Sequence, residues 1–228
     1  MTSESVFYQR GYRMSVHEHR EERRAQIKQA ALQLFATKGY ENTKVSTIVQ
    51  SVNVSQGTFY WYFASKEECA IEMLDEGRAQ MIALIQKGYR TQSFAIQDAI
   101  ASTQTMFEHI FKVAEEHPYL MQILFRGIYT QPVLQQRVED IKKDMEQAFA
   151  KNIERAKELG VLSNTLDAQF HALLIMSLLS GVLSRWLFRD EVNDVLFHQK
   201  TVQQIIKETV QFEFYGLFGS QLKGDINI

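Results

Sequence analysis

The chain has 228 residues, of which 45% are hydrophobic and 23% are charged, and its formal net charge is −2. This length allows one or two domains with a sizeable core, and the single cysteine, Cys69, excludes an intrachain disulfide framework. The N-terminus lacks the basic segment and apolar run of a secretory signal. We therefore expect a protein of the reducing cytoplasm.

Residues 1–19 show no apolar repeat at helical spacing, and we interpret them as a mobile N-terminal arm. The arm and the residues just after it carry arginines that could touch a nucleic-acid backbone, although a solvated tail is the favoured interpretation. These arginines are Arg10, Arg13, Arg20, Arg23 and Arg24. The pair His17 and His19 lacks further ligands at metal-binding spacing, so no metal site is expected.

Two helices are predicted between residues 26 and 52. The first, QIKQAALQLFATKG, has apolar side chains at helical spacing and stops at Gly39. The second is short, and Thr43 is its expected N-cap. Its inward face consists of Val45, Ile48, Val49 and Val52.

A sharp turn and a third helix follow. Asn53 tolerates the left-handed backbone that such a turn requires, Val54 can tuck beneath the turn, and Ser55 is the expected N-cap of the third helix. Phe59 and Phe63 lie four residues apart and are expected on the buried face of that helix. Polar side chains and outward-pointing N–H groups in its first turn suit contact with a DNA backbone and base edges.

Three segments carry a resemblance to a known family. AALQLFATKGYENT, VSTI and VSQGTFYWYFASKEE occur in the order and spacing of the TetR family of bacterial transcriptional regulators, which the chain resembles over roughly residues 22–70. The chain differs from the usual family pattern at Val49 and Val52, where alanine is common, and at Asn53, where glycine is usual. These differences concern the crossing of the helices more than the identity of the family.

The expected fold class is all-α, with a three-helix helix-turn-helix DNA-binding head followed by a helical-bundle ligand-binding and dimerisation domain. We place the arm at residues 1–19, the head at residues 20–66 and the larger domain at residues 67–228. Residues 1–68 hold nine Lys and Arg against seven Asp and Glu, a weak positive charge for a DNA-binding protein. A dimer, which doubles the contacts, is therefore expected.

The family resemblance also implies DNA-contacting residues. Gln56 and Thr58 are the predicted base-reading residues, because glutamine can pair with adenine and threonine can touch thymine. Tyr60 and Lys66 would fix the register on the backbone, although simple packing is an alternative for Tyr60. The full set is Thr43, Lys44, Gln56, Gly57, Thr58, Tyr60, Trp61, Tyr62 and Lys66.

Long helical patterns fill the rest of the chain. The first places Ile71, Leu74, Met81, Ile85 and Tyr89 on one stripe. Pro118, Pro132, Gly160 and a polar DEVND segment separate the later ones. We expect these later helices at roughly residues 95–116, 118–129, 132–159, 166–189 and 199–218.

The middle helices are rich in methionine and phenylalanine, which can line an adaptable apolar pocket. Residue by residue, such side chains are more often core filler, and only the resemblance implies an effector cavity. Polar groups that could orient a ligand include His109, Gln122 and Arg126, with a satisfied surface group as the alternative for each. The predicted ligand-binding set is Phe107, Phe111, Met121, Phe125, Arg126, Met145 and His171.

Two apolar helices near the C-terminus need a partner surface. Ser177, Gly181 and Ser184 form a stripe of small residues that permits close approach of another helix. The resemblance implies that these helices meet their symmetry copies in a homodimer. Residues 172–183, ALLIMSLLSGVL, are shorter than the roughly 20 apolar residues that a bilayer requires, so we expect a buried helix and no membrane span.

The sequence thus predicts a TetR-type repressor without cofactor or catalytic residues, which binds a near-palindromic operator as a dimer and is released by a small, lipophilic molecule. One alternative is a DNA-binding dimer without small-molecule control. Another is a helical enzyme that uses His109 or His171. Cys69 is not expected to be a nucleophile, because Glu67 and Glu68 beside it would raise its pKa.

Overall fold

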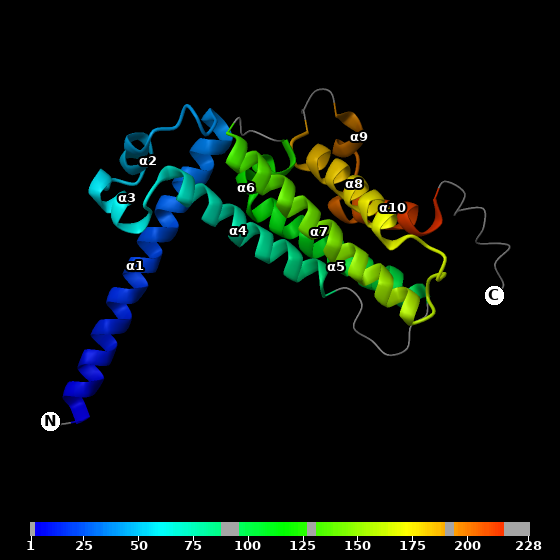
Figure 1. Cartoon of the computed structure of the whole chain (residues 1–228), viewed down its shortest axis with the longest axis horizontal. Helices are drawn as coiled ribbons and strands as arrows, with labels where there is room; N and C mark the ends of the chain where they lie inside the picture. The colour runs from blue at the N-terminus through cyan, green and yellow to red at the C-terminus, as the bar shows by residue number, and fades with distance from the viewer. Residues whose placement is uncertain (1–2, 88–95, 127–130, 190–193, 217–228) are drawn as a thin grey trace. The chain divides into compact units, whose positions relative to one another are not determined.

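The computed structural model describes residues 3–87, 96–126, 131–189 and 194–216. These residues form ten α-helices and no strand, so the all-α fold class is confirmed (Figure 1). The chain divides into two compact units, which we call the head and the body. The head comprises Met1–Leu74 with Ile128–Gln135, and the body comprises Asp75–Gly127 with Gln136–Ile228.

The first helix, α1, runs without a break from Ser3 to Lys38, as Figure 1 shows. Residues 3–19, which the sequence analysis assigns to a mobile arm, therefore belong to this helix. An apolar repeat reports burial, whereas a helix that is already nucleated extends at little cost through Glu- and Arg-rich sequence. The packed part of α1 supplies that nucleus, because Ile27, Ala31 and Phe35 are fully buried.

The two short helices of the head are α2, Val45–Ser51, and α3, Gln56–Tyr62. Gly39 ends α1 as predicted, with a φ of +83° that favours glycine. On α2, Ile48 and Val49 are buried, whereas Val45 and Val52 are half-buried. The valine at position 49 therefore fits between the helices of this head.

The remaining helices match the predicted segments closely. They are α4 Lys66–Ile85, α5 Ile96–Glu116, α6 Pro118–Arg126, α7 Pro132–Glu158, α8 Ala168–Leu187, α9 Val195–His198 and α10 Val202–Tyr215. The short α9 was not predicted, because four residues carry too little periodicity. Tyr89, predicted on the stripe of α4, lies outside the described residues.

Helices α4 and α7 each contribute to both units, so the unit boundary in α4 falls after Leu74 rather than at the predicted residue 66. Within the body, α10 packs mainly against α5, and α8 packs against α5, α6 and α10. The core between them contains Phe107, Phe111 and Ile110. The predicted domain boundaries remain a proposal.

Helix α8 buries only one of its faces. Its buried side chains are Ala168, Ala172, Met176, Leu179, Leu183 and Trp186. Phe170, Leu173 and Leu174 on the opposite face are 44 to 56% exposed. The predicted description as a buried helix is therefore wrong for this face. By length and composition alone the 20 residues of α8 could cross a membrane, although one such helix is weak evidence.

Candidate nucleic-acid interface and effector region

The turn between α2 and α3 has the predicted geometry. Asn53 adopts a φ of +53°, and the N–H of Val54 donates to the carbonyl oxygen of Val49 over 3.0 Å. Ser55 caps α3, because its Oγ accepts a hydrogen bond from the N–H of Thr58 over 3.1 Å. The Ser55 cap thereby defines the start of α3, and the Val54 hydrogen bond joins the turn to α2.

Helix α3 separates its aromatic residues between core and surface as predicted. Phe59 and Phe63 are buried, and their ring centroids lie 5.4 Å apart. Tyr60 is 53% and Trp61 is 60% exposed, while Tyr62 is half-buried. Buried phenylalanines thus hold a helix that presents large aromatic side chains to solvent, and Gln56 and Gly57 are exposed at its start.

Thr43 does not cap α2. The residue at the N-cap position is Lys44, which makes no side-chain cap bond. Thr43 is instead buried, and its Oγ1 donates to the carbonyl oxygens of Gly39 at 2.8 Å and Leu34 at 3.3 Å. Its side chain therefore secures the end of α1, and the predicted DNA contact gains no support from this position.

Lys66 is also used inside the head. Its Nζ donates to the carbonyl oxygens of Tyr40 at 2.7 Å and Thr43 at 2.9 Å, and burial lowers its pKa. The ammonium group lies 3.9 Å from the centroid of the Tyr40 ring. These contacts engage the ammonium group inside the head, and the predicted phosphate contact of Lys66 gains no support from them. No local pattern reveals this role, because the partners lie more than twenty residues earlier in the chain.

A charge cluster joins α1 to α4 within the head. The guanidinium of Arg24 donates to both carboxylate oxygens of Glu72, and Lys28 Nζ lies 3.0 Å from Glu72 Oε1. The nearby Cys69 is buried, which raises the pKa of its thiol to about 12. Burial is the larger cause, and the charge of Glu72 adds to it. The prediction that Cys69 is no nucleophile agrees with this environment.

The predicted ligand-binding residues are not gathered around one described pocket. Phe107, Phe111, Met121 and Met145 are buried core residues. Phe125 is half-buried and Arg126 is exposed. The guanidinium of Arg126 donates to the carbonyl oxygen of Phe188 over 3.2 Å and lies over the Phe188 ring.

His171 likewise has a local partner, since its Nδ1 lies 2.8 Å from the carbonyl oxygen of Asp167. For Arg126 and His171, the alternative of a satisfied group fits the structure better than a ligand contact. Neither contributes to the pocket described next.

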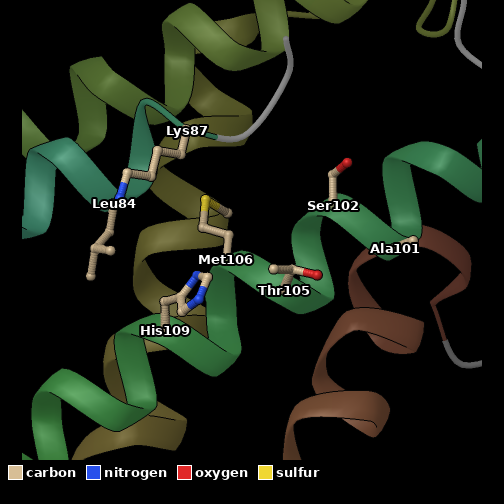
Figure 2. A pocket seen from close by; sticks show the side chains of 7 residues that line it. All are labelled: Leu84, Lys87, Ala101, Ser102, Thr105, Met106 and His109. Atoms are coloured by element: carbon tan, nitrogen blue, oxygen red, sulfur yellow. The ribbon is translucent and has the colours of Figure 1, made fainter. Parts of the chain in front are cut away.

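A pocket of about 280 Å³ lies between the C-terminal end of α4 and the side of α5 (Figure 2). Its lining consists of Leu84, Lys87, Ala101, Ser102, Thr105, Met106 and His109. It combines an ammonium group, an imidazole and two hydroxyls with apolar side chains, a mixture that suits an anionic group attached to an apolar one. Of these residues, His109 was predicted as a polar group that could orient a ligand, but the pocket itself was not predicted, although its lining recurs at helical spacing on α5.

The head, with its capped and exposed α3, defines a helix-turn-helix DNA-binding regulator with a separate helical body. A model for bacterial regulatory proteins of the tetR family matches residues 27–73, and a model for the C-terminal region of MAATS-type transcriptional repressors matches residues 102–212. The chain belongs to the TetR family of bacterial transcriptional regulators.

Individual relatives are distant. The uncharacterized HTH-type transcriptional regulator YdgC of Bacillus subtilis is 25% identical over 73% of this chain and 82% of its own length. The fatty acid degradation regulator FadR from Bacillus halodurans superposes with a TM-score of 0.67 at 22% identity, covering 85% of this chain and 95% of that one. FadR from Bacillus subtilis, solved in complex with stearoyl-CoA, gives a TM-score of 0.65 at 20% identity over 85% and 98% of the two chains. These structures share the fold.

Proposed function

We propose that the protein is a cytoplasmic, ligand-responsive transcriptional repressor that binds a near-palindromic operator as a homodimer. The exposed face of α3, anchored by buried Phe59 and Phe63, is the observation that carries this proposal. Two such helices about 34 to 36 Å apart would enter successive major grooves on one side of a duplex.

Within that interface, Gln56 and Thr58 are the proposed base-reading residues, because they stand at the capped start of α3. Tyr60, Trp61, Tyr62, Lys44 and the backbone of Gly57 would contact phosphates. Thr43 and Lys66 take a different role in this proposal. They position the end of α1 and the following loop, because their polar groups are engaged by backbone carbonyls.

The proposed dimer interface is the exposed apolar face of α8 with the neighbouring α10. Phe170, Leu173 and Leu174 on α8 and Phe212 on α10 are each more than 40% exposed. Gly181 on α8 has open space where a side chain would stand, which permits close approach of a second helix. A second copy would cover these side chains through an isologous four-helix contact.

For the effector we propose a fatty acyl-CoA. The FadR structures from two Bacillus species support this class, since one of them holds stearoyl-CoA. In this chain, Lys87 and His109 could meet part of the anionic CoA moiety at the pocket beside α5. The acyl chain would require space in the apolar body beyond that pocket.

Release of DNA would follow from differential affinity. An effector that binds the non-DNA-binding conformation about 100-fold better shifts the equilibrium by roughly 2.7 kcal/mol. An effector with equal affinity for both conformations would change nothing.

Selection of bound fragments from random and genomic DNA tests the proposal. Recovery of an inverted repeat supports the dimeric repressor, and absence of any specific fragment contradicts it. The recovered operator is then titrated with stearoyl-CoA, lauroyl-CoA and, as a control, CoA without an acyl chain. Release by the acylated forms alone supports the effector class. DNA binding that responds to none of them would favour a DNA-binding dimer without control by acyl-CoA.

A further inference from the structure

The exposed indole of α3 is covered on one face by an arginine from α1. The Cζ atom of Arg20 lies 4.2 Å from the centroid of the Trp61 ring, within the range of a cation–π contact. Both side chains are exposed. A residue from α1 therefore stands beside the helix that is proposed to enter the DNA.

Arg20 differs from the two arginines that follow it. Arg24 donates to both oxygens of Glu72, and Arg23 donates to the side chain of Gln26 over 2.9 Å. Arg20 has neither a carboxylate partner nor a hydrogen bond within the part of the chain that the structure describes. Its positive charge is therefore uncompensated by the described neighbours.

The contact over the ring leaves the N–H donors of Arg20 without a hydrogen-bond partner among the described residues. A guanidinium that lies over a ring uses its planar face, whereas its N–H donors point outward in the plane. Those donors match the oxygens of a phosphate, which they can contact in a bidentate manner. The indole thus reduces the freedom of the guanidinium without occupying its donors.

We infer that Arg20 is an additional DNA-backbone contact, held in place by Trp61, so that the DNA interface extends from α3 onto α1. This inference rests on the proposed DNA-binding function. A phosphate contact from Arg20 would add affinity without reading sequence, which is useful to a head whose net charge is only weakly positive.

The test compares Arg20→Ala with Arg23→Ala, which removes the same charge from an exposed position one turn of α1 away. The dissociation constant is measured over a series of salt concentrations, for the selected operator and for an unrelated duplex. We expect Arg20→Ala to weaken binding to the operator and to the unrelated duplex by a similar factor, on the order of tenfold. The slope of log affinity against log salt concentration should fall by about 1 for each protomer. Arg23→Ala should leave the salt slope at the wild-type value. Arg20→Lys, which keeps the positive charge, should retain most of the slope that Arg20→Ala loses.

Equal salt slopes for Arg20→Ala, Arg23→Ala and the wild-type protein would overturn the inference while leaving the repressor proposal intact. Failure of the wild-type protein to select any DNA would contradict the repressor proposal itself. The stack has a separate readout without DNA. In a Trp186→Phe background, where Trp61 is the remaining tryptophan, Arg20→Ala should change the tryptophan emission and Arg23→Ala should not. An unchanged emission in both variants would contradict the stack in solution.

Discussion

Lys66, the first residue of α4, reaches back to Tyr40 in the loop after α1. Its ammonium group donates to the Tyr40 carbonyl oxygen over 2.7 Å and also lies against the face of the Tyr40 ring. A lysine at a helix N-terminus faces the positive end of the helix dipole, so this position is unfavourable without compensation. The carbonyl oxygens of Tyr40 and Thr43 provide this compensation, and their hydrogen bonds with Lys66 connect α4 to the loop before α2.

The first prediction concerns this tie. Lys66→Met should lower the free energy of unfolding of the head by about 2 kcal/mol, because two hydrogen bonds from a charged donor are lost. Urea unfolding followed by circular dichroism measures the effect. Lys44→Met changes an exposed lysine in the loop that contains Tyr40 and Thr43, and it should leave stability within about 0.5 kcal/mol of the wild-type value. Unchanged stability of Lys66→Met together with weaker DNA binding would instead support a phosphate contact from Lys66.

The sequence predicted what local patterns encode. The helix stop at Gly39, the turn at Asn53, the cap at Ser55 and the buried rings of α3 each depend on residues within a few positions of one another. The helix boundaries of the body follow from proline, glycine and apolar spacing in the same way.

Partners that are distant in sequence could not be predicted. Thr43 suits an N-cap by its type, but the folded head brings its hydroxyl to the carbonyl of Leu34, nine residues earlier. The carbonyl partners of Lys66 and the pocket beside Lys87 likewise depend on how helices cross. Residue type alone also could not show that Phe107 and Phe111 belong to the core rather than to a pocket, because either role fits the same helical spacing.

The second prediction concerns the contact between α4 and α6. A Cβ atom at Gly77 would lie 2.6 Å from Cδ2 of the buried Leu120. Gly77→Ala should therefore destabilise the protein by about 1 kcal/mol, since overpacking costs about 2 kcal/mol, the middle of its usual range, and the gain in helix propensity returns about 1 kcal/mol. In the background Leu120→Ala the same substitution should be neutral or stabilising. Additive effects in this double-mutant cycle would contradict the close contact.

The third prediction addresses the proposed dimer. Leu174→Glu places a charge on the exposed apolar face of α8 and should convert the dimer to a monomer in sedimentation equilibrium, with loss of operator binding. Gln169→Glu introduces the same charge at an exposed polar position near the start of α8 and should remain dimeric. A dimeric Leu174→Glu variant would place the interface on another surface.

The fourth prediction separates base reading from backbone contact on α3. Gln56→Ala should weaken binding mainly at one base position, by about 1 to 3 kcal/mol, because an amide pair with a base edge is lost. Tyr60→Phe should weaken binding to all sequences similarly, since only a phosphate contact is removed. Affinities are measured against a panel of singly substituted operators. Identical base preferences for the wild-type protein and Gln56→Ala would remove Gln56 from the base-reading residues.

The fifth prediction concerns Glu213 near the end of α10. Its Oε2 is buried and has no hydrogen-bond partner among the described residues, and burial raises the pKa of this carboxyl group to about 7. A carboxylate near a helix C-terminus is also disfavoured by the helix dipole. Glu213 is therefore best tolerated when it is protonated.

The sign of the pH effect follows from proton binding. Between the unfolded pKa of about 4.5 and the folded pKa of about 7, the native state binds more protons than the unfolded state, so stability falls as pH rises through this window. The loss is at most about 3 kcal/mol. Glu213→Gln should remove this dependence and stabilise the protein at pH 8, while Glu208→Gln, at an exposed position of α10, should keep it. Urea unfolding at pH 5, 6, 7 and 8 measures the free energy of unfolding of both variants and of the wild-type protein. The same dependence on pH for Glu213→Gln and the wild-type protein would show that Glu213 is not buried in solution.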